Sequence, residues 1–292
     1  MPGSRPTPVA ATDDAGVTAR LAVLGHPIEH SKSPALHAAA YRALGLDWSY
    51  EAVDVTGDDL GPFIESRGSD WRGLSLTMPL KRDVMPLLHG MDHYSELTGG
   101  ANTVLFAGGT LHGFNTDVHG VVEAFRSAGV DRLHSVRVLG GGATAASVLV
   151  AAHRMGADRV ALSVRAPERL GALISLAERL DLALTVETLG AFDSGFIADA
   201  AVSTLPNGTQ PDFPPAALSA VTVPGGPLFD VAYEPWPTAL AADWSGPVIP
   251  GLEMLAQQAL VQVRIFVNGA PDVVLPDEAS VFRAMRNAVG LA

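Results

Sequence analysis

Two charged side chains in the first half of the chain have the chemistry for moving a proton. Lys81 follows the stretch LSLTMPL and Asp117 follows GFNT, each just past a strand-like segment. Ligands of α/β sheets gather beyond the carboxyl ends of strands, so both side chains are expected to face one crevice. An ammonium group beside a carboxylate suits acid–base work and charge stabilisation. Which group holds the proton is left open, because burial lowers a lysine pKa and a nearby carboxylate raises it.

The stretch GHPIEHSKSP, residues 25–34, places two serines one residue apart at the start of a helical segment. Ser31 and Ser33 offer two hydroxyl donors where a helix N-terminus already favours negative charge. A carboxylate clamp is therefore predicted, although the same serines are also suited to capping the helix alone. His26 and His30 lie four residues apart on a turn without a metal-ligand motif, so no metal is expected.

A glycine-rich loop predicts a dinucleotide site in the second half of the chain. GGGATA, at residues 140–145, follows the strand-like VRVL and opens a helix. Gly140, Gly142 and Ala145 fit the pattern G-x-G-x-x-A, in which the first glycine makes the tight turn, the second lets the backbone approach a pyrophosphate, and the small third residue allows close packing of helix and strand. The N–H groups at the helix start bind phosphate. The predicted cofactor contacts are Gly140, Gly141, Gly142, Ala143, Thr144 and Ala145.

The end of the next strand-like segment indicates which dinucleotide is bound. LSVRAPER has no acidic residue at the strand end, where an NAD site usually has one for the ribose hydroxyl groups. It has Arg165, and Arg169 four residues later. The planar guanidinium binds phosphate oxygens in pairs, so NADP is the predicted cofactor. Glu168 lies between the arginines and blurs this preference.

The elements that must position these groups alternate between strands and helices. RLAVLGHP, WSYEAVDV and WRGLSLT are strand-like and are separated by helical segments, and NTVLFAGGTLHGFNT predicts a hairpin around Gly108-Gly109. From about residue 120, strand, glycine turn, helix and strand follow one another over about 30 residues, the length of a βαβ unit. Two helices close the chain. The pattern predicts an α/β fold with two domains.

Composition narrows the class of protein. The 292 residues are 48% hydrophobic and 17% charged, which is typical of a globular chain long enough for two domains. The net charge is -12 with scattered basic residues, so no nucleic acid is expected as a partner. There is no cysteine, which excludes disulfides and thiolate sites. With no secretory signal or membrane span in the sequence, we expect a cytoplasmic protein with no membrane partner. Residues 1–17 are predicted to be a flexible tail.

These motifs occur in the order found in the shikimate dehydrogenase family, which the chain resembles over nearly its whole length. The matching stretches are GHPIEHSKSPALH, GLSLTMPLK, GGANTV, GFNTDVHG, VLGGGATA, STLPNG, DVAYEPWPTAL and PGLEMLAQQA. The resemblance implies a substrate domain at 18–119 and 251–292, completed by the C-terminal helices, and a Rossmann-type NADP-binding domain at 120–250. It implies reversible, NADPH-dependent reduction of 3-dehydroshikimate to shikimate, in the biosynthesis of chorismate and the aromatic amino acids.

The resemblance also implies roles for single residues. Lys81 and Asp117 would form the catalytic pair, and Ser31 and Ser33 would hold the substrate carboxylate. The other implied substrate contacts are Ser75, Thr77, Asn102, Tyr233 and Gln258. The implied cofactor contacts outside the glycine loop and the two arginines are Thr204, Leu205, Val231, Gly251 and Met254.

The chain departs from the family pattern at three places. Ser75 stands where the family often has asparagine, and a serine has no amide group to offer a substrate. The loop GGGATA replaces the common GAGGA. The usual N-R-T at the strand end becomes V-R-A, which keeps the arginine and loses one polar contact to a 2′-phosphate.

Other functions are consistent with the same motifs. One is a dehydrogenase that acts on quinate as well as shikimate, or on an amino analogue of shikimate, with NAD. Another is a non-catalytic sensor that binds NADP or shikimate, although the retention of Lys81 and Asp117 argues against it. The oligomeric state is left open between monomer and homodimer.

Overall fold

The computed structural model describes residues 19–291, which form two compact units. The first comprises the chain up to Ser95, Gly100–Thr116 and the chain from Ala259 onward; the second comprises Glu96–Gly99 and Asp117–Gln258. The domain boundaries predicted from the sequence lie near the residues at which the chain passes from one unit to the other, and they remain a prediction. The predicted tail at 1–17 lies outside the described residues.

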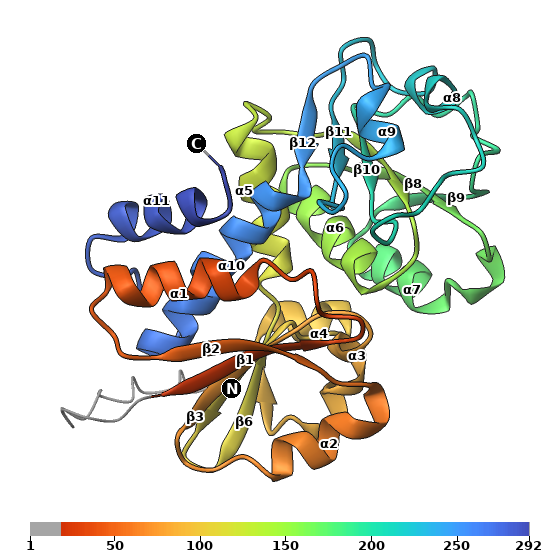
Figure 1. Cartoon of the computed structure of the whole chain (residues 1–292). Helices are drawn as coiled ribbons and strands as arrows, with labels where there is room; N and C mark the ends of the chain where they lie inside the picture. The colour runs from red at the N-terminus through yellow and green to blue at the C-terminus, as the bar shows by residue number, and fades with distance from the viewer. Residues whose placement is uncertain (1–18, 292) are drawn as a thin grey trace. The chain divides into compact units, whose positions relative to one another are not determined.

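The first unit is built on a mixed sheet with the strand order β2-β1-β3-β5-β6-β4. Figure 1 labels β1, β2, β3 and β6 of this sheet. β1, β2 and β3 are parallel, and β5 is antiparallel to both β3 and β6. β6 therefore points the same way as β3, and β4 pairs with it in parallel. The hairpin predicted around Gly108-Gly109 is present as β5 and β6. The strands are β1 (Arg20–Gly25), β2 (Ser49–Asp54), β3 (Trp71–Leu76), β4 (Gly90–Met91), β5 (Thr103–Ala107) and β6 (Thr110–Phe114).

Helices cover both faces of this sheet, and the alternation of side chains along β3 shows which helix lies on which face. Leu74 and Leu76 join a core cluster with residues of α2 and α3. A Cβ on Gly73, which points the other way, would meet the Phe266 ring of α10 at 2.8 Å. The helices are α1 (Ser33–Ala43), α2 (Gly57–Glu65), α3 (Leu80–Asp83), the 3₁₀ turn η1 (Met85–Leu87), α4 (His93–Thr98), α10 (Gly251–Asn268) and α11 (Glu278–Ala288). Of these, α4 and α10 each contribute to both units.

The second unit is built on a fully parallel sheet with the order β12-β11-β10-β7-β8-β9. Counted from β7, this is the strand order 6-5-4-1-2-3 of a dinucleotide-binding fold. The strands are β7 (Ser135–Leu139), β8 (Arg159–Val164), β9 (Ala183–Thr188), β10 (Ala200–Ser203), β11 (Leu228–Asp230) and β12 (Val248–Pro250). The helices are α5 (Asp117–Ser127), α6 (Ala143–Arg154), the 3₁₀ turn η2 (Pro167–Arg169), α7 (Gly171–Arg179), α8 (Pro215–Ser219) and α9 (Ala239–Ala242). The predicted α/β class and Rossmann-type unit are confirmed.

A buried ion pair fastens the segment between β9 and β10, which crosses the sheet without a helix. Arg137 on β7 reaches over β8 to Glu187 on β9, with the two side chains 2.6 Å apart and almost fully buried. Arg137 also donates to the carbonyls of Asp193 and Phe196, while Glu187 accepts from Ser163 and from the Asp193 N–H. Burial lowers the pKa of the Arg137 guanidinium, and Glu187 opposes this shift. The pair therefore replaces helix packing as the anchor of this crossover.

Candidate active site

Most of the predicted substrate residues of the first unit lie at one edge of its sheet. β1 and β3 are parallel, so the loops that follow Gly25 and Leu76 leave the sheet side by side. Backbone bonds join these loops: the Thr77 N–H donates to Leu24 at 2.9 Å, and the His26 N–H donates to Met78 at 2.9 Å. The serine loop after β1 and the loop carrying Lys81 after β3 are therefore held together.

Lys81 is half-buried on the short helix α3 and is fixed through its main chain. Its carbonyl accepts from the Ala101 N–H at 2.9 Å. A Cβ on Gly100 would lie 3.3 Å from the same carbonyl, so a larger residue there would crowd it. This bond places Lys81 beside the residue that precedes Asn102.

Asn102 stands just before β5 and is almost fully buried. Its Nδ2 donates to Thr116 Oγ1 at 2.9 Å, and its Oδ1 accepts from the Thr116 N–H and the Thr103 hydroxyl, each at 2.9 Å. These bonds fix the chain where β6 ends. Asp117 follows directly as the first residue of α5 and is buried.

The two serines of the predicted carboxylate clamp differ in their surroundings. Ser31 Oγ accepts from the Ser33 N–H at 3.3 Å, a long bond that caps the start of α1. Ser33 is 5% exposed, and among the described residues its hydroxyl has no hydrogen-bond partner. The Ser33 hydroxyl oxygen is not one of the fully buried unpartnered atoms of the described residues, so it keeps contact with solvent and is open to a ligand. The carboxylate clamp predicted at these two serines remains a prediction.

Ser75 has a different environment from the one its predicted role requires. It is 3% exposed, on the β3 face that packs against α10. Its hydroxyl accepts from Tyr50 at 2.7 Å and donates to Gln262 Oε1 at 2.9 Å. Both hydrogen-bonding functions are therefore used inside the protein, and the predicted contact with a substrate remains a prediction.

Sequence reasoning missed the buried network to which Ser75 belongs. Gln262 Nε2 donates to the Asn102 carbonyl at 3.2 Å and to Thr103 Oγ1 at 3.0 Å, and its Oε1 also lies 3.2 Å from His37 Nε2. The His37 ring stacks on Tyr50 with 3.9 Å between centroids. Burial lowers the pKa of His37 to about 3, with Gln262 opposing, so the ring is neutral near pH 7. The one available signal was spacing, because Gln262 lies four residues after Gln258 on one helix.

The second unit gathers its predicted cofactor residues at the carboxyl edge of the parallel sheet. The glycine loop follows β7, Arg165 follows β8, Thr204 and Leu205 follow β10, Val231 follows β11, and Gly251 follows β12. Because every strand points the same way, all these residues lie along one edge.

The glycine loop has the shape that a pyrophosphate requires. Gly140 has φ +102°, and a Cβ there would lie 2.5 Å from Thr204 Oγ1, so only glycine fits. At Gly142, φ is -84° and a Cβ would meet nothing within 4 Å. Gly142 is the N-cap of α6, a position that favours glycine over alanine, and the open space above it leaves room for a phosphate against the helix N-terminus. Ala143 and Thr144 open that helix, and Ala145 is buried against the sheet.

Arg165 and Arg169 are exposed, and within residues 19–291 neither forms an ion pair. Arg165 directly follows β8, and Arg169 ends the turn η2. No acidic residue stands at the end of β8, and Glu168 is exposed. The residues present fit a dinucleotide with a 2′-phosphate.

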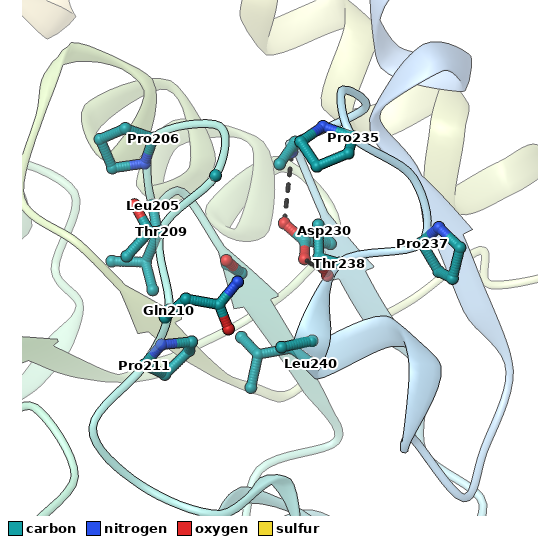
Figure 2. A pocket seen from close by; sticks show the side chains of 14 residues that line it. Leu205, Pro206, Thr209, Gln210, Pro211, Asp230, Pro235, Pro237, Thr238 and Leu240 are labelled. Atoms are coloured by element: carbon teal, nitrogen blue, oxygen red, sulfur yellow. Dashed lines mark hydrogen bonds between the residues drawn. The ribbon is translucent and has the colours of Figure 1, made fainter.

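The remaining predicted residues of the second unit lie in the loops after β11 and β12 and on α10. A Cβ on Gly251 would lie 3.0 Å from the Ala232 carbonyl, so this strand-to-helix turn passes directly against the loop after β11. The Tyr233 N–H donates to Asn207 Oδ1 at 3.3 Å. Gln258 Nε2 donates to the Leu255 carbonyl at 2.9 Å, and Met254 is buried. Figure 2 shows the small pocket between the loops after β10 and β11, with Leu205 and Asp230 among its walls.

Across residues 19–291, no three His, Asp or Glu side chains are grouped so that they could hold a metal ion. In the same part of the chain, none of the helices has both the length and the apolar character needed to cross a bilayer.

Comparison with known proteins agrees with this geometry. The sequence model of the shikimate dehydrogenase substrate binding domain matches residues 23–104. The chain is 33% identical over 276 residues to the shikimate dehydrogenase (NADP(+)) of one strain of Thermus thermophilus, covering 93% of this chain and 99% of that one. The crystal structure of the Mycobacterium tuberculosis shikimate dehydrogenase superimposes with a TM-score of 0.79 at 31% identity, covering 92% of this chain and 99% of the other. The enzyme of another Thermus thermophilus strain, in complex with NADP(H) and shikimate, gives a TM-score of 0.76 at 32% identity, covering 93% and 100%.

The parallel sheet and glycine loop define a protein with a Rossmann-type dinucleotide-binding unit. The sequence identity and its coverage then decide the family. This chain belongs to the shikimate dehydrogenase family.

Gly142→Ala is expected to weaken NADP binding about tenfold or more while lowering the melting temperature much less than Gly140→Ala does. The added methyl group meets no protein atom within 4 Å, but it occupies the space through which a pyrophosphate would approach α6. Titration calorimetry with NADP and a thermal melt measure the two effects. Gly140→Ala is the contrasting variant and should lower the melting temperature, because φ there is positive and Thr204 is in the way. Wild-type affinity for NADP in the Gly142→Ala variant would show that the loop does not contact the cofactor.

Proposed function

We propose that this protein catalyses the reversible reduction of 3-dehydroshikimate to shikimate with NADP as cofactor. The observation that carries the proposal is the shared sheet edge in the first unit. There, the loop with Ser33 and the loop with Lys81 are bonded to each other, and Asn102 is adjacent. Family membership and the relatives named for NADP-dependent shikimate dehydrogenation support the same reaction.

The substrate carboxylate is proposed to bind at Ser31 and Ser33. The unpartnered Ser33 hydroxyl and the N-terminus of α1 together favour an anion at this point. Binding the carboxylate here fixes which end of the ring faces the reacting groups. Thr77 and Asn102 at the same edge are proposed to contact ring hydroxyls.

Lys81 is proposed to exchange the proton at the reacting oxygen, with Asp117 as the second member of the acid–base pair. Bound NADPH supplies the hydride, and the protein must neutralise the charge that develops on the oxygen. Lys32 and Lys81 are the only lysines among 19 Lys and Arg residues, so the chain uses arginine for nearly all its cationic positions. An arginine cannot give up its proton in a protein, whereas a lysine can. Lysine at position 81 is therefore consistent with proton transfer.

Arg165 is proposed to bind the 2′-phosphate of NADP, with Arg169 in support. Both guanidinium groups are exposed and without an ion pair in the described part of the chain, so a phosphate that binds them displaces no carboxylate. A cytoplasmic location and a monomeric or homodimeric state complete the proposal.

The proposed reaction is tested by a substrate-by-cofactor comparison. Values of kcat/KM for shikimate, quinate and aminoshikimate, each with NADP and NAD, should be largest for shikimate with NADP. The two arginines and the absence of an acid at the end of β8 are the reason for the cofactor preference. A larger value for quinate with NAD would replace the proposed activity with a quinate dehydrogenase. Binding of shikimate and NADP without any reduction of NADP would indicate a sensor.

Lys81→Ala should lower kcat by about 10²–10⁴-fold with little change in KM, because it removes the proton-transferring group. Lys81→Arg should be nearly as impaired, since it keeps the charge but cannot release a proton. Lys32→Arg is the matched control and should behave as wild type. Steady-state kinetics at saturating NADP make the measurement. A normal kcat in the Lys81→Arg variant would show that Lys81 contributes only its positive charge and does not transfer a proton.

Ser33→Ala should raise KM for shikimate about tenfold or more with kcat largely retained. Hydrogen bonds to charged groups contribute about 1.5–3 kcal/mol, and the Ser33 hydroxyl has no partner to lose within the described residues. The methyl ester of shikimate provides the control, because a neutral ester should lose much less than the carboxylate does. An equal rise in KM for the acid and the ester would indicate that the serines only cap the helix.

A further inference from the structure

A buried carboxylate closes the loop after β11, outside the residues assigned to the reaction so far. Asp230 is the last residue of β11 and is 2% exposed. Its Oδ2 accepts from the Thr238 hydroxyl at 2.6 Å, and its Oδ1 accepts from the Ala232 N–H at 3.2 Å. One carboxylate therefore bonds both ends of segment 231–238, defined here as the residues from Val231 to Thr238.

Segment 231–238 carries two residues for which the family resemblance implies a role in binding. Val231 leads it and donates its N–H to the Ser203 carbonyl at 3.0 Å. Tyr233 follows, and its N–H donates to Asn207 Oδ1 at 3.3 Å. The Ala232 carbonyl lies against Gly251, as the 3.0 Å approach of a Cβ built there shows. A shift of this segment would move Val231 and Tyr233 together.

Packing alone does not hold the segment. A pocket of about 50 Å³, more than the room that a single water needs, lies between this segment and the loop after β10. Figure 2 shows Asp230 and Thr238 on one wall of this pocket and Thr209 and Gln210 on the opposite wall. Pro235, Trp236 and Pro237 at the tip are exposed. The hydrogen bonds that Asp230 accepts from Ala232 and Thr238 therefore contribute to fixing its path.

The chemistry of the site requires a carboxylate. Thr238, Ala232 and Ser203 all present donors to Asp230, and burial raises the pKa of this carboxyl while those bonds oppose the rise. An ionised carboxylate only accepts, whereas an amide would turn an NH₂ group toward a donor. Thr238 Oγ1 also accepts from the Ala241 N–H at 3.1 Å, so its own proton is free to point at Asp230.

We propose that Asp230 is a positioning residue for the reaction, whose carboxylate, with Thr238, fixes segment 231–238 and so places Val231 and Tyr233 for cofactor and substrate. This rests on the proposed function. It adds the Asp230–Thr238 pair to the residues on which the reaction depends, without direct contact with the reacting atoms.

The test compares Asp230→Asn, Thr238→Val and Thr238→Ser, with Thr209→Val as the matched control on the opposite pocket wall. Thr238→Val should lower kcat/KM for shikimate about tenfold or more, since small misplacements of binding groups are costly in rate. Thr238→Ser keeps the hydroxyl and should retain the wild-type kcat/KM for shikimate. Thr209 makes no side-chain hydrogen bond within the described residues, so its variant should match wild type. The double variant Asp230→Asn/Thr238→Val should be no worse than the more impaired single one.

Amide hydrogen exchange without any ligand provides a readout that does not depend on activity. The Ala232 and Tyr233 amides should exchange several-fold faster in Asp230→Asn and Thr238→Val, and at the wild-type rate in Thr238→Ser and Thr209→Val. Unchanged exchange or unchanged kinetics in Thr238→Val would overturn the inference, as would a fall in melting temperature with normal kcat and KM. If Asp230→Asn does not fold, the comparison of Thr238→Val with Thr238→Ser decides whether the inference holds. A wild-type protein without activity on shikimate would overturn the proposed function, while the exchange data still decide whether Asp230 orders the segment.

Discussion

The direction of the strands is the constraint on which the candidate substrate residues of the first unit and the candidate cofactor residues of the second unit both depend. Parallel pairing forces the loops after successive strands to leave from the same edge of a sheet. In the first unit this brings the loop after β1, with Ser33, next to the loop after β3, with Lys81. In the second unit it aligns the glycine loop after β7 with every other loop that carries a predicted cofactor residue. Residues far apart in the sequence thereby become neighbours without any contact between their own side chains.

Buried polar groups then make these edges rigid. A polar group taken out of water is costly unless it is hydrogen-bonded, and a satisfied network has few alternative arrangements. Gln262 binds the end of β3 and the start of β5 through Ser75, Thr103 and the Asn102 carbonyl. In the second unit, Arg137 and Glu187 do the same for the helix-free crossover between β9 and β10. Gln262 thereby links two adjacent strands, and Arg137 fastens a crossover that has no helix.

Much of the fold followed from local patterns, because apolar periodicity and glycine turns report on strands and helices directly. The predicted hairpin, the βαβ unit at the glycine loop and the two closing helices are all present. The short elements α3, α4, α8 and α9 were not predicted, since four to six residues carry too little periodicity. The missing helix between β9 and β10 was also invisible, because its substitute is an ion pair between residues 50 positions apart.

The sequence by itself determined the chemical inventory: a lysine, a carboxylate, paired serines, a glycine loop and an arginine at a strand end, each recognisable from its type and its neighbours. Only the tertiary structure decided how those groups are used. It showed that the Ser33 hydroxyl has no partner within the described residues while Ser75 is engaged by Tyr50 and Gln262. It also revealed Asp230 as the acceptor that closes a loop. The physical reason is that hydrogen-bond satisfaction depends on which groups meet in space, and burial is a property of the packed chain that no single stretch of sequence carries.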